Sequence, residues 1–135
     1  MKKILFLFLA FTAISITSCS SDDDNAEVSI LGKWYNNREA ETENGQIVWV
    51  AYQNECAGKR DYFEFLQNNI LKDVYQSDFN NCVAEDDVLS WSRNGNTITV
   101  DGETGEIVLL NNTTLQVKFA DPEVSNLFYY IEFVR

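Results

Sequence analysis

The sequence predicts an all-β domain, an up-and-down antiparallel barrel of eight or nine short strands. From Val28 onward, short apolar or alternating runs are separated by turn dipeptides such as Asn44-Gly45. No run keeps a sustained 3.6-residue apolar period, although Val28–Leu31 has room for one short turn. Most connections are short enough for neighbouring strands to pair, and closing the sheet removes its exposed edges. An open β-sandwich is the alternative architecture.

The first two strands are expected on either side of Asn44-Gly45. Residues 32–38 begin the folded part with Gly-Lys-Trp, and residues 47–52 read Ile-Val-Trp-Val-Ala-Tyr, which is rich in β-branched and aromatic side chains. The polar residues 54–60 then predict a loop.

The next two strands are expected at residues 61–67 and 70–75. The first of them alternates, with Phe63 and Phe65 on one face. Asn68-Asn69 turns the chain between the two strands.

The sharpest local signal is a hairpin over residues 89–100. Residues 89–93 and 96–100 alternate on either side of Asn94-Gly95, which predicts a tight type I′ turn. The polar, acidic residues 76–87 are expected to form the one long connection before it.

Three further strands are expected, at residues 106–110, 115–119 and 127–134. A turn at residues 101–105 precedes them. Pro122 falls in the last loop, where it interrupts no strand.

Residues 1–18 predict a signal peptide. Two lysines precede an apolar core from Ile4 to Ile16, which is too short for a relaxed membrane span. The run Ile16-Thr17-Ser18-Cys19 resembles a bacterial lipobox, which implies acylation of Cys19 and anchoring to a lipid bilayer. An ordinary secretory leader with an incidental cysteine is the alternative.

Residues 19–27 are expected to form a tether, since Ser20–Asn25 is polar and acidic and cannot pack. An acidic run at this place resembles the surface-export signal of Bacteroidota lipoproteins, which implies an outer-membrane lipoprotein exposed at the cell surface. A plain solvated linker explains the same residues, and a calcium loop lacks its spaced ligands. The folded domain then spans residues 28–135.

Two cysteines, Cys56 and Cys82, remain once Cys19 is assigned to acylation. In an exported chain such a pair most simply forms a disulfide. Two free thiols and a shared metal are the alternatives, but two cysteines without histidine do not make a zinc site.

Composition excludes several functions. The formal net charge of −11 argues against nucleic acid as a partner, and the absence of histidine removes Ser-His-Asp and Cys-His catalysis and His-ligated metals. We therefore expect a protein that is not an enzyme, with no cofactor and no metal. We also expect a monomer.

An ordered set of motifs resembles the lipocalin-like domain common among Bacteroidota lipoproteins. The set comprises Gly32 and Trp34 (Gly-x-Trp), Cys56, Phe63 and Phe65, Cys82, the hairpin Trp91–Asn96, and Thr113–Val117. The resemblance implies that Arg135, after the last strand, lies over Trp34 and seals the closed end of the barrel. The chain departs from the larger lipocalins in its short strands and in having no room for their C-terminal helix.

Six aromatic residues are candidates for lining a ligand cavity: Trp49, Phe63, Phe65, Trp91, Tyr129 and Phe133. The competing interpretation is that they fill the barrel, because eight-stranded barrels are only just wide enough for side chains, so we expect a filled barrel or a small cavity. Two function classes follow. One is a membrane-anchored binding module for a small apolar or amphipathic ligand. The other is a cell-surface structural or protein- or glycan-interaction lipoprotein with a packed barrel.

Overall fold

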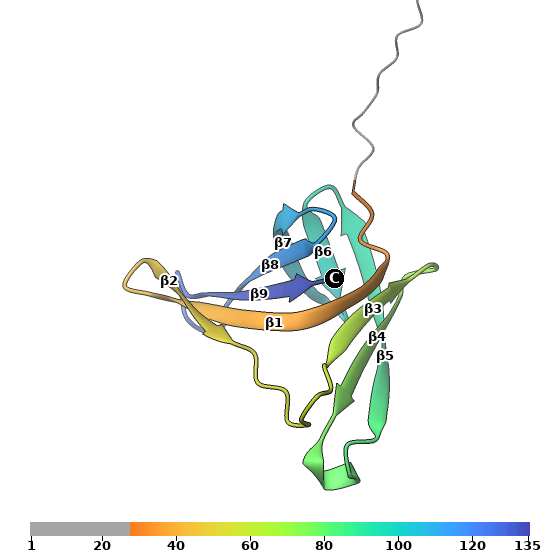
Figure 1. Ribbon diagram of the computed structural model, residues 1–135. Helices are drawn as coiled ribbons and strands as arrows, with labels where there is room; N and C mark the ends of the chain where they lie inside the picture. Colours follow the sequence, from red (N-terminus) through yellow and green to blue (C-terminus); the bar gives the residue numbers. More distant parts are fainter. Residues whose placement is uncertain (1–27) are drawn as a thin grey trace, which may run out of the picture.

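The computed structural model describes residues 28–135, which form a closed antiparallel barrel with one additional strand (Figure 1). The predicted signal peptide, Cys19 and tether lie outside the described residues. The strands are β1 (Gly32–Glu43), β2 (Gln46–Ala51), β3 (Tyr62–Leu66), β4 (Ile70–Gln76), β5 (Ala84–Asn94), β6 (Thr97–Val100), β7 (Glu103–Leu110), β8 (Thr114–Ala120) and β9 (Phe128–Val134). A single-turn 3-10 helix, η1 (Asp78–Asn80), precedes β5. The all-β barrel predicted from the sequence is confirmed, and the sandwich is not formed.

The eight strands β1 and β3–β9 close the barrel through the pairing of β1 with β9. On the edge that does not face β9, the 12-residue β1 pairs with two strands in turn. Residues 32–35 pair with β3, and residues 38–43 pair with β2. The meander is therefore interrupted once, because β3 pairs with β1 and not with β2. The ninth strand, β2, extends the sheet beyond the barrel wall.

A β-bulge between Asn36 and Arg38 marks the place where β1 changes partner. The chain leaves β2 at Tyr52, whose N–H donates to the Asn37 carbonyl at 3.0 Å, and returns at Asp61, whose carbonyl accepts from the Asn36 N–H at 3.1 Å. Residues 53–60 are thus an excursion that starts and ends beside the same point of β1.

Three strands are longer than the sequence predicts. β1 continues to Glu43, β5 begins at Ala84 and not at residue 89, and β7 begins at Glu103. The predicted connection 76–87 is consequently wrong at its two ends, because Gln76 belongs to β4 and residues 84–87 belong to β5. In each case charged residues continue a ladder because a paired partner strand satisfies their backbone groups, as β4 does for Glu85–Asp87.

The hairpin between β5 and β6 is confirmed, but its turn is not the predicted one. Asn94 pairs with Thr97, so the two loop residues are Gly95 and Asn96. Of these only Gly95 has a positive φ, of 59°, which fits a type II′ turn and excludes type I′.

The hydrophobic core lies toward one end of the barrel, where β1 and β6 begin and β7 and β9 end. Its most deeply buried side chains include Trp34, Leu71, Ile98 and Leu115. We call this the closed end, and we call the opposite end, where β3 begins and β4 ends, the mouth.

The first and last strands meet at the closed end as the family resemblance implies. The guanidinium carbon of Arg135 lies 3.9 Å from the ring centroid of the fully buried Trp34. Arg135 Nη2 also donates to the carbonyls of Ser29 and Leu31 at 3.1 and 2.6 Å. Gly32 has a φ of +109°, a conformation that L side chains rarely adopt, so glycine is required there.

This contact predicts energetic coupling between residues 101 positions apart in the chain. Arg135→Ala is expected to lower the free energy of unfolding by about 1–2 kcal/mol, and by clearly less in a Trp34→Leu background that has no π face. Chemical denaturation of the four proteins gives the coupling energy, expected at about 0.5–2 kcal/mol. Additivity within about 0.3 kcal/mol contradicts the stacking.

Candidate functional site

An apolar cavity of about 270 Å³ lies inside the barrel toward the mouth. Four barrel strands and the start of β7 form its wall. The lining residues are Phe63, Phe65, Ile98, Val100, Glu103, Val117, Phe119, Tyr129, Ile131 and Phe133. The expectation of a small cavity is therefore the one that the structure supports, and we call this space the barrel cavity.

The alternation of β-strands explains why these side chains converge. Phe63 and Phe65 on β3 and Ile131 and Phe133 on β9 are separated by two positions each, so they share the inner face. The rings of Phe63 and Phe133 lie 5.2 Å apart between centroids. Gly105 faces the same interior, and a Cβ there would lie 2.7 Å from the Phe119 ring, so glycine leaves room for that ring.

Four of the six aromatic candidates line the barrel cavity: Phe63, Phe65, Tyr129 and Phe133. The other two do not. The aliphatic members of the wall, such as Ile98 and Val117, were missed because aromatic size was used as the signal. Extending the period-2 alternation through β6, β8 and β9 would have identified them.

Trp49 lies on the outer surface. The Arg38 guanidinium lies 4.3 Å from its ring centroid, and the Tyr130 ring packs against it at 6.1 Å. The register explains this, since Trp49 pairs with Ala40, which pairs with Tyr130 on the other side, and these side chains share the outer face.

Trp91 belongs to the closed end. Its ring packs edge-on against Phe65 at 5.1 Å, and its Nε1–H donates to the Leu66 carbonyl at 3.1 Å. The aromatic ring is inside the barrel, as predicted, but it supports the wall and does not line the cavity.

A second recess of about 390 Å³ adjoins the mouth along β1, β2 and β9. We call it the β2 recess. It shares Tyr129 and Ile131 with the barrel cavity, so the two spaces meet at these side chains. Its remaining lining residues are Glu39, Ala40, Glu41, Val48, Val50 and Tyr130. Val50 is 63% exposed, which leaves apolar surface available beside the mouth.

The Tyr129 ring borders both spaces, and a residue of the β8–β9 connection holds its hydroxyl by a hydrogen bond. The hydroxyl donates to Asp121 Oδ2 at 2.7 Å. This hydrogen bond raises the pKa of Tyr129 and, together with the N–H groups of Val124 and Glu123, lowers the pKa of Asp121. The Tyr129 ring is thereby held in place where ligand and solvent would meet.

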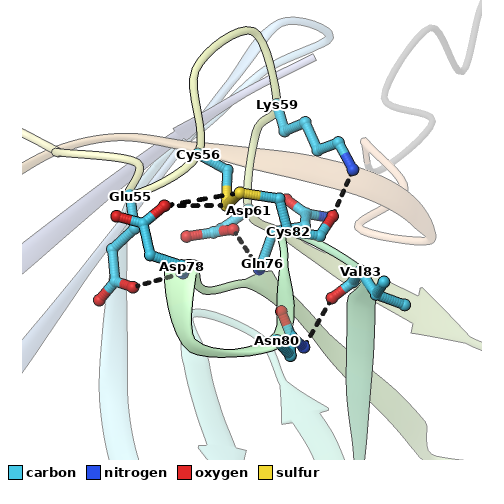
Figure 2. The surroundings of a disulfide bond; sticks show 9 residues. All are labelled: Glu55, Cys56, Lys59, Asp61, Gln76, Asp78, Asn80, Cys82 and Val83. Carbon is cyan, nitrogen blue, oxygen red and sulfur yellow. Dashed lines mark hydrogen bonds between the residues drawn. A yellow bond between two sulfur atoms is a disulfide. The ribbon is translucent and has the colours of Figure 1, made fainter.

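The loops at the mouth are joined by the predicted disulfide. Cys56, in the excursion 53–60, is bonded to Cys82, which follows η1 (Figure 2). Lys59 Nζ donates to the Cys82 carbonyl across the same gap. The bond ties the β2–β3 connection to the β4–β5 connection and so fixes one side of the mouth.

Asp61 organises the polar contacts beneath the disulfide. Its carboxylate accepts from the Tyr52 hydroxyl at 2.8 Å and from the Gln76 N–H at 2.9 Å, and its own N–H donates to Asn54 Oδ1 (Figure 2 shows Asp61 and Gln76). The pKa of Tyr52 is raised to about 12, mainly by burial of its hydroxyl and next by its hydrogen bond to Asp61. Asp61 is 5% exposed, so its role is to satisfy buried donors.

The described residues hold one group of three potential metal ligands, Cys56, Asp78 and Cys82. Both sulfurs are in the disulfide and carry no thiolate, so this group is not a metal centre. In residues 28–135 no helix is long and apolar enough to cross a bilayer.

Comparison with known proteins bears on the fold and the family. A comparison with curated protein sequences finds no match. Among solved structures, a deswapped triple mutant of bovine odorant-binding protein is similar, with 16% sequence identity and a TM-score of 0.42, over 77% of this chain and 72% of that chain. The family model of the lipocalin-like domain matches residues 30–117. The chain therefore belongs to the lipocalin-like domain family.

Proposed function

We propose that this protein is a non-catalytic binding module that holds a small apolar or amphipathic molecule in the barrel cavity. The observation that carries the proposal is the cavity itself, about 270 Å³ of space with nine of its ten lining residues apolar or aromatic. Ligand sites typically occupy about 300–1,000 Å³ and have mostly apolar walls, so the cavity suits a small ligand. The adjoining β2 recess adds room for a part of the ligand outside the barrel.

The chemistry of the wall supports binding over catalysis. Glu103 is the one ionisable group of the barrel cavity apart from the Tyr129 hydroxyl, which is engaged by Asp121. An acid–base reaction needs a second positioned group. The chain also has no histidine to supply one.

The other function class, a surface-interaction lipoprotein, needs a packed barrel. The apolar cavity favours the binding module, because a small apolar ligand would gain dispersion contacts with its wall.

Binding is tested with N-phenyl-1-naphthylamine, a neutral apolar dye whose fluorescence rises in an apolar site. The dye is expected to bind the full chain carrying Cys19→Ala, which is used in detergent-free buffer because detergents are amphiphiles themselves. Val100→Trp fills the cavity and is expected to weaken binding by about tenfold or more, which corresponds to about 1.4 kcal/mol.

The matched control is Val88→Trp, which adds the same ring at an outward position that is 66% exposed. It is expected to leave dye binding unchanged. Equal loss in both variants, or no dye binding by the parent protein, contradicts the proposal.

We further propose that the module is anchored to the outer membrane through acylated Cys19 and displayed at the cell surface. The support is the lipobox-like run Ile16–Cys19 and the acidic residues after it. Two or three acyl chains would give durable attachment.

Radiolabelled palmitate is expected to enter the wild-type chain and to be absent from the Cys19→Ala variant. Protease added to intact cells is expected to degrade the displayed domain. Equal labelling of the two proteins would refute the anchor, and protection from protease would refute surface display.

A further inference from the structure

The charged side chains that line the barrel cavity and the β2 recess are all carboxylates. Glu103 lies in the wall of the cavity, and Glu39 and Glu41 line the recess. No lysine or arginine of the described residues is among the lining groups of either space. The apolar interior is thus bordered by one sign of charge.

The register of the sheet extends this border to β4 and β5. Asp73 pairs with Phe63, a residue of the cavity wall, and also with Asp87 on its other side. Because directly paired residues share a face, both carboxylates lie on the inner face near the mouth. The pKa of Asp73 is raised, mainly by burial and to a smaller extent by the negative charges of Asp87 and Asp61. Concentrated negative charge here is therefore costly to the free protein.

Basic side chains are found on the opposite face of the same strands. Lys72 contacts Asp86 at 3.2 Å, Lys118 contacts Glu106 at 3.8 Å, and Arg38 contacts Glu132 at 2.7 Å. By register these six residues are outward-facing. The barrel wall therefore separates these charges, with the three ion pairs outside and the carboxylates on the inner face near the mouth. A basic side chain at the mouth, Lys59, lies on the loop 53–60 and donates to the Cys82 carbonyl.

A solvated acidic surface is the usual explanation of a group of carboxylates. Here the carboxylates come from different strands and surround the entrance of an apolar cavity, so a ligand entering the barrel must pass through their field. Glu39, Glu41 and Glu103 are exposed to solvent, and an entrance lined by one sign of charge concentrates cations and repels anions.

We propose that the ligand is an amphipathic cation, with an apolar body in the barrel cavity and an ammonium-type head group among Glu39, Glu41 and Glu103 at the mouth. This inference rests on the proposed binding function and specifies the charge of its ligand. The Tyr129 ring, which borders both spaces, offers an aromatic face to the same head group.

The test compares three competitors with one apolar chain: octyltrimethylammonium, octanol and octanoate. Each displaces N-phenyl-1-naphthylamine from the full chain carrying Cys19→Ala. At low ionic strength octyltrimethylammonium is expected to bind about tenfold more tightly than octanoate, with octanol between them. In concentrated salt the ratio is expected to shrink, because exposed charges are screened.

The double variant Glu39→Gln/Glu41→Gln is expected to lower the ratio of cation to anion affinity by about threefold or more. The matched control is Glu64→Gln/Glu106→Gln, which removes the same charge from outward positions. It is expected to keep the ratio, so the comparison separates charge at the mouth from net charge.

The outcomes distinguish the two proposals. Binding of the dye with octanoate equal to or better than octyltrimethylammonium overturns the cation inference and leaves the binding module standing. An equal loss of preference in the two double variants also overturns it. No binding of the dye or of any competitor overturns the proposed function, and the inference with it.

Discussion

Replacing Cys56 and Cys82 together by serine is expected to lower the free energy of unfolding by about 3.5 kcal/mol. The bond closes a loop with a sequence separation of 26 residues, and chain-entropy arguments assign roughly this value to a loop of that length. Small domains are stabilised by only about 5–15 kcal/mol in total, so the loss is a large share.

The measurement is urea denaturation of the wild-type protein and the double serine variant, each with and without dithiothreitol. The reductant is expected to destabilise the wild type by a similar amount and to leave the variant unchanged. Since the bond joins loops at the mouth, the variant is also expected to bind N-phenyl-1-naphthylamine more weakly. Equal stability of the two oxidised proteins contradicts the assigned role.

Glu132→Gln is expected to lower the free energy of unfolding at pH 7 by about 2–3 kcal/mol. The carboxylate is 5% exposed and accepts four hydrogen bonds, two from Arg38 at 2.7 Å each, one from Asn37 at 2.7 Å and one from Gln116 at 2.5 Å. A glutamine amide turns a donor toward these donors. The expected loss is smaller than for a fully buried ion pair, because the Arg38 side chain is 40% exposed and solvent screens its charge.

The cost of this substitution is expected to depend on pH. The hydrogen bonds from Arg38, Gln116 and Asn37 lower the pKa of Glu132 below its ordinary value of 4.5. The folded state therefore holds the proton less tightly than the unfolded state, and the stabilisation is present above about pH 4.5 and is lost as the pH falls through the folded pKa. The difference between wild type and variant should shrink over that interval.

The matched control is Glu106→Gln, which breaks the outward ion pair with Lys118 at 3.8 Å. Because the Glu106 side chain is 62% exposed, its loss is expected to cost less than about 0.5 kcal/mol. A similar cost for the two substitutions, or a pH-independent cost at Glu132, contradicts the network.

The barrel, its closure and its disulfide could be predicted because each depends on a local or pairwise signal. Alternating residues on either side of Asn44-Gly45 specify a hairpin, and both turn residues have positive φ values, as expected. The Gly-Lys-Trp run and the terminal Arg135 specify the contact at the closed end through the resemblance to lipocalins. Two cysteines left in a chain that is predicted to be exported allow one pairing.

The strand ends at the mouth could not be predicted, because pairing with neighbouring strands, and not the composition of the segments, makes them β-strands. Glu85–Asp87 has no apolar alternation, and it is a strand because β4 pairs with it. The change of partner along β1 depends on the bulge at residues 36–38, and no local residue signal marks that bulge. Trp49 was placed inside for the same reason, since the face of β2 depends on its register with β1.

The barrel cavity was predicted only in part. Aromatic size identified Phe63, Phe65, Tyr129 and Phe133, whereas the aliphatic wall required knowledge of which strands face each other. The border of carboxylates could not be recognised from the sequence, because members such as Glu39, Asp73 and Glu103 come from separate strands. Such a set becomes visible only once the barrel is closed.

Occupation of the barrel interior by an apolar ligand underlies both the proposed function and the inferred ligand charge. It is tested most directly by amide chemical-shift mapping in the ¹⁵N-labelled full chain carrying Cys19→Ala, titrated with N-phenyl-1-naphthylamine. Binding inside the barrel is expected to give saturable amide shifts at Ile98, Val100, Phe119 and Ile131, whose side chains line the cavity. Shifts confined to outward residues such as Lys72 and Val88, with none at the cavity wall, would contradict it.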